Sequence, residues 1–141
     1  MSDLRYWLAF NCTRGIGSVK VRALLKQFVS LEAAWNDSLS GWAAAGLDRR
    51  AARSLKAAQS NLDLDRLVQD VAARDVRVLT WENEGYPTNL SKFPDRPHVL
   101  YVRGEMEVAD EWAVAIVGTR RASAYGRSVA RDLGHSLARE G

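Results

Sequence analysis

Residues 113–126 read Ala-Val-Ala-Ile-Val-Gly-Thr-Arg-Arg-Ala-Ser-Ala-Tyr-Gly, an apolar run that ends at a glycine and is followed by two arginines. The run over 113–117 contains β-branched residues and no charge, which predicts a strand buried on both faces. From Ser123 the pattern becomes helical, because apolar residues recur at four-residue spacing from Val129 to Leu137. The sequence therefore predicts a strand, a tight turn and a helix in succession.

The predicted turn is suited to binding an anion such as phosphate. At a helix N-terminus, unpaired backbone N–H groups and the positive end of the helix dipole converge. Gly118 lets a ligand approach the backbone, and the hydroxyls of Thr119 and Ser123 can assist. Arg120 can form forked hydrogen bonds to a phosphate, and Arg121 adds positive charge. The alternative interpretation is a sharp connection that binds nothing, and the spacing differs from the GxGxxG dinucleotide motif.

Composition limits the classes of protein without selecting one. The chain has 141 residues, of which 47% are hydrophobic and 26% charged, as in ordinary globular proteins. Its net charge of +3 permits a polyanionic partner but does not require one. The single cysteine, Cys12, excludes an internal disulfide and fits a reducing compartment, and we interpret it as a small packing residue. With no signal pattern and no membrane-spanning run, we expect a cytoplasmic protein without a membrane partner.

Residues 1–74 contain no strong strand candidate and predict an almost wholly helical domain. Helices are expected over 21–28, 31–35 and 39–45, and after the capping residues Asp48 and Asp63. Trp7, Trp35 and Trp42 are expected to join these helices in one core.

From Asp75 the periodicity changes, which places a domain boundary near Arg74–Asp75 and a second domain over 75–141. Short strands are expected over 76–79 and 99–102, in addition to the run over 113–117. A strand followed by a helix is half of a parallel βαβ unit, whose partner strand normally comes later in the chain. The expected fold class is α+β, and we expect the chain to be the N-terminal portion of a longer protein.

A second candidate phosphate contact lies at Gly15-Ile16-Gly17, between two amphipathic helices. This arrangement resembles a helix-hairpin-helix element, in which a glycine-rich turn and the next helix grip a DNA phosphate without reading sequence. Lys20 and Arg22 are the expected phosphate partners. The alternative is a tight helical turn in which the glycines relieve crowding.

Two further groups of side chains have ordinary interpretations. The helix after Asp48 carries a basic side, which either follows a nucleic-acid backbone or is a solvated surface: Arg49, Arg50, Arg53 and Lys56. His98 and His135 have no nearby nucleophile, acid or metal-ligand spacing. We therefore predict no enzyme, no metal and no cofactor.

Several segments, taken together, are typical of one family. They are Arg14-Gly15-Ile16-Gly17 with Arg22-Ala23-Leu24-Leu25, Tyr86-Pro87-Thr88-Asn89-Leu90, Pro97, Leu100-Tyr101-Val102-Arg103-Gly104, and Ala115-Ile116-Val117-Gly118-Thr119-Arg120 with Ala122-Ser123 and Tyr125-Gly126. In this set the chain resembles the DNA-processing protein A (DprA/Smf) family of bacterial natural transformation. The resemblance implies a helical domain of the SAM-like or helix-hairpin-helix kind over 1–74, followed by the first part of a Rossmann-like domain over 75–141.

The resemblance also implies a function. Proteins of this family bind single-stranded DNA, protect incoming strands and help to load the recombinase RecA, and they are not known as enzymes. The full-length protein would use later surfaces for RecA and for a homodimer. By motif, Gly118, Thr119 and Arg120 would form part of the DNA-phosphate pocket, next to Arg121. Ser123 and Gly126 would shape the helix start beneath it.

Two alternatives remain open. The glycine and hydroxyl spacing at Gly118-Thr119, Tyr125-Gly126 and Leu133-Gly134 also resembles Rossmann-like nucleoside-monophosphate phosphoribohydrolases of the lysine-decarboxylase-like family. Those enzymes lack a helical front domain with a Gly-x-Gly turn. In the second alternative, the tryptophan-rich helices over 1–74 are a protein-interaction module and DNA contact is incidental.

Overall fold

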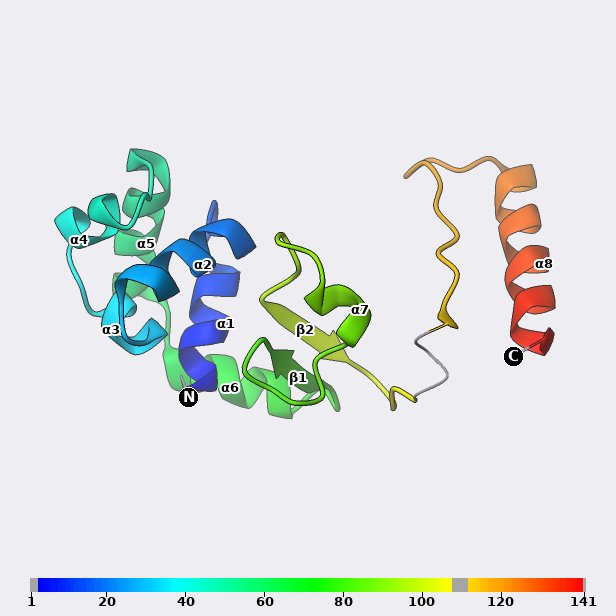
Figure 1. Ribbon diagram of the computed structural model, residues 1–141, viewed down its shortest axis with the longest axis horizontal. Helices are drawn as coiled ribbons and strands as arrows, with labels where there is room; N and C mark the ends of the chain where they lie inside the picture. The colour runs from blue at the N-terminus through cyan, green and yellow to red at the C-terminus, as the bar shows by residue number, and fades with distance from the viewer. Residues whose placement is uncertain (1–2, 108–111, 141) are drawn as a thin grey trace. The chain divides into compact units, whose positions relative to one another are not determined.

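The computed structural model describes residues 3–107 and 112–140, which belong to two compact units divided after Glu105 (Figure 1). The first unit contains α1 (Leu4–Cys12), α2 (Ser18–Gln27), α3 (Leu31–Trp35), α4 (Leu39–Ala44), α5 (Arg49–Asn61), α6 (Leu64–Ala72), β1 (Arg77–Thr80), α7 (Thr88–Ser91) and β2 (Val99–Val102). The second unit contains α8 (Ala124–Glu140). Helices with one small sheet confirm the α+β class. Among the described residues, no helix is long and apolar enough to cross a membrane.

Side-chain caps begin most of the longer helices of the first unit. The Asp48 carboxylate accepts a hydrogen bond from the Ala51 N–H at 2.9 Å, and the Asp63 carboxylate accepts one from the Arg66 N–H at 3.0 Å. Both caps confirm the sequence prediction, because each side-chain oxygen satisfies an N–H that has no partner within its own helix. The short helices predicted over 31–35 and 39–45 are also confirmed as α3 and α4.

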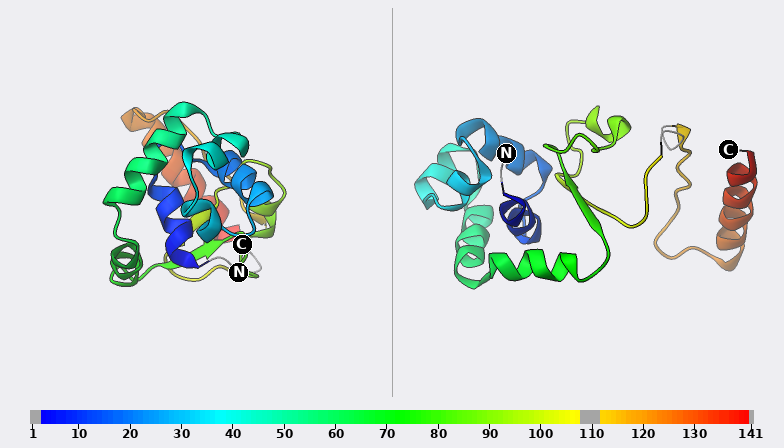
Figure 2. Two further views of the ribbon diagram at one scale, coloured as in Figure 1. Left: turned by 90° about the vertical axis from the view of Figure 1, so that its left-hand side faces the viewer. Right: turned by 90° about the horizontal axis from the view of Figure 1, so that it is seen from below.

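The core of the first unit forms around α1, which contacts α3, α6 and β2 (Figure 2). Trp7, Trp35 and Trp42 are all buried, as predicted. The Phe10 and Trp35 rings meet edge to face at 5.5 Å, and the Trp42 indole N–H donates to the Ala34 carbonyl at 2.6 Å. Trp42 thus buries its apolar rings without leaving its polar atom unpaired.

The glycine turn between α1 and α2 has a backbone reason. Gly15 has φ of +83°, a left-handed conformation that side chains with a Cβ disfavour. The next residue, Ile16, is buried against the core, and Gly17 is the N-cap of α2. The chain therefore turns sharply between α1 and α2 at Gly15.

Strands β1 and β2 form a two-stranded antiparallel sheet in which Arg77 pairs with Val102 and Thr80 with Val99. Both predicted strands are confirmed to within a residue or two. Buried Leu79 lies on β1, and Val99 of β2 joins the helical core. Residues 75–105 therefore pack with the helices in one compact unit. The domain boundary near Arg74–Asp75 stays a prediction.

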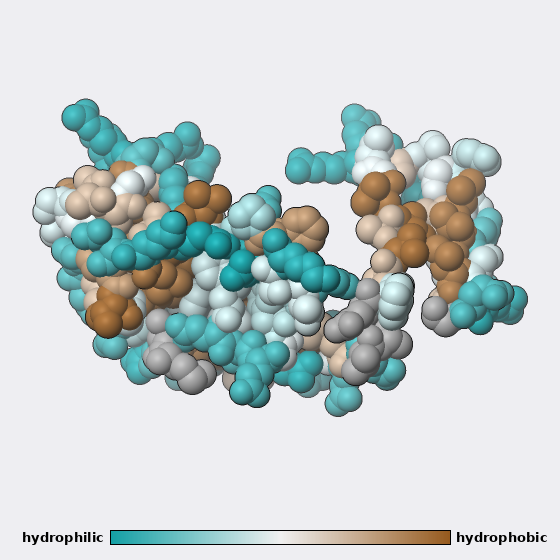
Figure 3. Space-filling view, in the orientation of Figure 1, coloured by the Kyte–Doolittle hydropathy of each residue, from teal (hydrophilic) through white to brown (hydrophobic). Residues whose placement is uncertain are grey.

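In the second unit, the prediction of a strand over 113–117 is wrong for this structure. These residues form neither a strand nor a bridge. A strand exists only where a neighbouring strand completes its hydrogen bonds, and no such neighbour occurs among the described residues of this unit. The segment instead packs on α8, where the Ile116 methyl lies 3.6 Å from the point at which a Cβ of Gly134 would stand. Figure 3 shows hydrophobic residues gathered between them.

Candidate nucleic-acid interface

The predicted phosphate-binding turn joins the 113–117 segment to α8. As predicted, the helix begins just after Ser123, whose hydroxyl accepts a hydrogen bond from the Gly126 N–H at 3.1 Å. The Arg127 guanidinium donates to the Ala122 carbonyl at 2.6 Å. Two contacts therefore hold the last turn residues against the first turn of the 17-residue helix.

The predicted site residues of this turn are exposed. Gly118, Thr119, Arg120, Arg121 and Ser123 all lie on the surface, while Gly126 is half-buried. Among the described residues, the side chains of Thr119, Arg120 and Arg121 form no hydrogen bond or ion pair. Two arginines thus add charge close to the positive end of the α8 dipole.

Three neighbouring residues refine the prediction. A Cβ placed on Gly126 would make only an ordinary contact with the Ser123 hydroxyl at 3.5 Å, so space alone does not require glycine there. Tyr125 is 79% exposed, so its ring does not pack on the helix start. The sequence did not indicate Arg127 as a residue of this turn, although its position four residues after Ser123 places it within the first turns of the helix.

At the second predicted contact, the side chains of Lys20 and Arg22 bind different partners within the protein. The Lys20 ammonium group donates to the Gly15 carbonyl at 2.9 Å and pairs with Asp48 at 2.6 Å. This hydrogen bond lowers the pKa of the Asp48 carboxyl to about 2, because it stabilises the ionised form. Arg22 instead donates to the Pro94 carbonyl at 2.6 Å. Both cations already have partners within the protein.

Arg22 is also part of a cluster that the sequence did not reveal. Its guanidinium carbon lies 5.1 Å from the centre of the Trp81 ring, and that of Arg96 lies 4.9 Å from the same ring. Such contacts are attractive because the ring face carries negative electrostatic potential. No local spacing could have indicated this cluster, because its three residues lie far apart in the chain.

The Tyr86-Pro87 motif has a structural role in the same region. The Tyr86 hydroxyl donates to the Pro97 carbonyl at 2.7 Å, and the Trp81 indole N–H donates to the same oxygen at 2.9 Å. Tyr86 is buried, and α7 follows directly after Pro87. Tyr86 therefore fastens the loop between the two strands.

His98 next to this loop is a buried side chain, 4% exposed, with ring neighbours Trp7 and Trp81. Its Nε2 atom has no hydrogen-bond partner among the described residues. Burial lowers the pKa of His98 to about 4, because the charged imidazolium is poorly solvated there. His98 is therefore neutral at pH 7 and belongs to the core.

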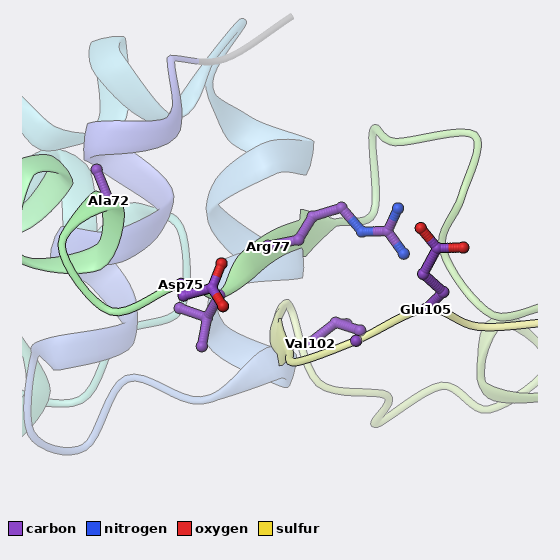
Figure 4. Close-up of a pocket in the computed structure, with 7 residues that line it drawn as sticks. Ala72, Asp75, Arg77, Val102 and Glu105 are labelled. Carbon is purple, nitrogen blue, oxygen red and sulfur yellow. The ribbon is translucent and has the colours of Figure 1, made fainter.

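A surface hollow of about 470 Å³ lies where α6 leads into β1 (Figure 4). Asp75, Arg77 and Glu105 give it charges of both signs, and it contains no histidine or cysteine. Within residues 3–107 and 112–140, no group of three potential metal ligands occurs. Cys12 is exposed, so its interpretation as a packing residue is wrong.

Comparisons with known proteins agree on one family. The family model described as DNA recombination-mediator protein A matches residues 77–141. The chain is 26% identical to Protein Smf of Synechocystis sp. over 145 residues, which covers 99% of the chain and 36% of that protein. It is 29% identical to DNA processing protein DprA of Bacillus subtilis over 79 residues, which covers 55% of the chain and 27% of that protein.

The matches thus span 36% and 27% of the length of these two curated relatives. No solved structure matches it significantly. These matches do not favour the alternative of a phosphoribohydrolase, because the family and both relatives carry names of DNA processing or of Smf.

Proposed function

Since the chain belongs to the DNA-processing protein A (DprA/Smf) family, we propose that it binds single-stranded DNA through the turn between Gly118 and Ser123. The family is described as one of DNA recombination mediators. The observation that carries the proposal is the exposed pair Arg120 and Arg121 directly before the N-terminus of α8, with no partner for either side chain among the described residues.

The proposed contact is to the phosphate backbone. Backbone amides of Gly118 and of the first turn of α8 face one phosphate, while Arg120 donates forked hydrogen bonds to it or to its neighbour. The Thr119 hydroxyl and Arg121 add a donor and a charge. Because all these groups recognise phosphate, binding is independent of base sequence and weakens as salt rises. Ser123 and Gly126 hold the helix start in place through their hydrogen bond.

A secondary DNA contact at Gly15, Gly17, Lys20 and Arg22 belongs to the same proposal. The N–H groups at the start of α2, where no side chain caps the helix, can donate hydrogen bonds to a phosphate. Lys20 would first have to leave Asp48, and Arg22 would have to leave Pro94 and Trp81. This contact should therefore add less to the affinity than the turn before α8.

The wider role follows the family. We propose that 1–74 forms a SAM-like or helix-hairpin-helix domain and that 75–141 contributes the first part of a Rossmann-like domain. We further propose that the parent protein is cytoplasmic, acts in natural transformation without enzymatic activity, forms a homodimer and helps to load RecA on the strand that it protects.

The test is a binding titration by fluorescence anisotropy, with a labelled oligo-dT strand and a matched duplex at increasing salt. The expected result is a preference for the single strand. Replacing Arg120 with Ala should weaken that binding about tenfold, since a hydrogen bond to a charged group contributes about 1.5–3 kcal/mol. It should also reduce the dependence on salt by about one counterion. Thermal unfolding should not change, because Arg120 is exposed.

Arg139→Ala is the matched control, because Arg139 lies in the last turn of the same helix and carries the same charge. Equal weakening by both variants would show that only net charge matters and would contradict the proposed turn. Duplex preference would shift the contact to the hairpin at Gly15–Gly17. Binding that is retained in full by Arg120→Ala would remove Arg120 from the site.

A further inference from the structure

A groove between α4 and α5 combines an apolar floor with a basic rim. It has a volume of about 240 Å³ and is lined by Leu39, Ala43, Leu47, Arg49, Ala52 and Arg53. Leu47 and Ala52 are buried and form the floor, while Ala43 and half-exposed Leu39 form the wall. This volume is below the roughly 300–1,000 Å³ of most small-molecule sites, so the groove fits a side chain better than a whole ligand.

Within residues 3–107 and 112–140, no acidic side chain pairs with the arginines on the rim. Arg49 and Arg53 are one helical turn apart, both are exposed, and among the described residues neither side chain forms a hydrogen bond or an ion pair. Neither α4 nor α5 contains a carboxylate. The nearest acidic residue in sequence, Asp48, pairs with Lys20 and caps α5.

We propose that this groove docks a short acidic segment of a partner protein. One aliphatic or aromatic side chain of the segment enters the floor at Leu47 and Ala52, and flanking carboxylates bind Arg49 and Arg53. Arginine suits this role because its planar fork pairs with a carboxylate through two parallel hydrogen bonds. The apolar contact supplies affinity that salt does not screen.

The lining favours a peptide over a nucleic-acid strand. Single-stranded DNA is held by aromatic side chains on which bases stack, in addition to positive charge. None of the residues that line the groove is aromatic. The inference concerns the first unit alone, and it does not depend on the DNA contact proposed for the turn before α8.

The test uses the full chain and a fluorescein-labelled synthetic peptide, Glu-Asp-Leu-Phe-Asp-Glu, with binding followed by anisotropy. Filling the groove with Ala43→Leu should weaken binding about tenfold, whereas Ala44→Leu, on the same helix outside the lining, should leave it unchanged. The double variant Arg49→Glu/Arg53→Glu should also weaken binding at least about tenfold. Replacing both Arg50 and Lys56 with Glu is the matched control for charge, because both are exposed on the same helix but do not line the groove.

Folding of each variant is checked by circular dichroism, and the replacements should be tolerated because they change exposed positions. The proposal is overturned if the peptide does not bind, or if Arg50→Glu/Lys56→Glu weakens binding as much as Arg49→Glu/Arg53→Glu does. It is also overturned if oligo-dT displaces the peptide and itself binds the Ala43→Leu variant normally, because the basic rim would then be a nucleic-acid surface.

Discussion

The two compact units of this protein differ in where their apolar side chains lie. In the first unit, Trp7, Phe10 and Trp42 are at most 1% exposed. In the second unit, no residue of α8 is buried, and Val117 on the segment beside it is 89% exposed. The apolar residues of α8 recur as regularly as those of the core helices. Among the described residues, however, no complete surface covers them.

The candidate DNA contact therefore lies on the unit with little core of its own, and the folding free energy resides in the other. Burial of apolar area is the main favourable term in folding, so substitutions in the two units should have very different effects. The predictions below test this contrast.

The largest expected effect is the loss of a buried tryptophan. Trp42→Ala should lower the free energy of unfolding by about 3–5 kcal/mol, because it leaves a cavity and removes the hydrogen bond to the Ala34 carbonyl. Trp112→Ala is the matched control in the second unit, where the side chain is 89% exposed. It should change stability by no more than about 0.5 kcal/mol. Urea unfolding followed by circular dichroism measures both. Similar losses in the two variants would refute the contrast.

The next effect is a dependence of stability on pH that arises in the first unit. The pKa of His98 is lowered from 6.5 to about 4 by burial, so the unfolded chain binds the proton more readily than the folded one. The free energy of unfolding is therefore highest above pH 6.5. It falls as the pH is lowered from 6.5 to 4, by about 3 kcal/mol at most. Thermal unfolding between pH 7 and 4 measures it. A His98→Leu variant should lose less stability over that range, and an unchanged slope would contradict this assignment.

A smaller effect is expected from Arg96, whose guanidinium lies over the Trp81 ring. Replacing Arg96 with Met should cost about 1 kcal/mol, because it removes a cation–π contact and hydrogen bonds to the carbonyls of Ser91 and Phe93. Arg50→Met, on an exposed part of α5, should cost almost nothing. A double-mutant cycle of Arg96→Met with Trp81→Leu, read by urea unfolding, isolates the ring contact. A coupling energy of zero would show that the stack contributes nothing.

The smallest effect is expected at the apolar surface of the second unit. Val117→Ser should leave the unfolding transition of the first unit unchanged to within about 0.5 kcal/mol, because Val117 is 89% exposed. A destabilisation above about 1 kcal/mol would mean that Val117 is covered by other residues. The two units would then differ less in apolar burial than the exposed fractions indicate. Light scattering of the same variant reports whether the exposed apolar surface promotes self-association.

Local signals predicted much of the fold. Asp48 and Asp63 were recognisable as caps because an N-cap acts on N–H groups two or three residues away. The strands at β1 and β2 and the start of α8 were predicted for the same reason, since their patterns repeat within a few residues. The strand expected over 113–117 fails because a strand also needs a neighbour, which its own composition cannot supply.

The candidate site likewise has residues that local sequence predicts and residues whose partners only the fold decides. The exposed arginines of the turn before α8 follow from a polar run at the end of an apolar one, and the structure leaves their side chains exposed. Lys20 and Arg22 were expected to act together, yet the fold gives them separate partners, in Asp48 and in the Pro94 carbonyl.

Spacing within a few residues is therefore sufficient for the helices, the caps and the polar turn, because hydrogen bonds along a helix join near neighbours. Contacts between residues far apart in the chain do not follow from such spacing. Arg22 meets Pro94 across 72 residues, and Lys20 meets Asp48 across 28. Which cation keeps a free charge, and whether His98 can hold a proton, depends on which surfaces the packed helices and the small sheet bring together. Burial and pairing are properties of that packing, and no local pattern in the chain encodes them.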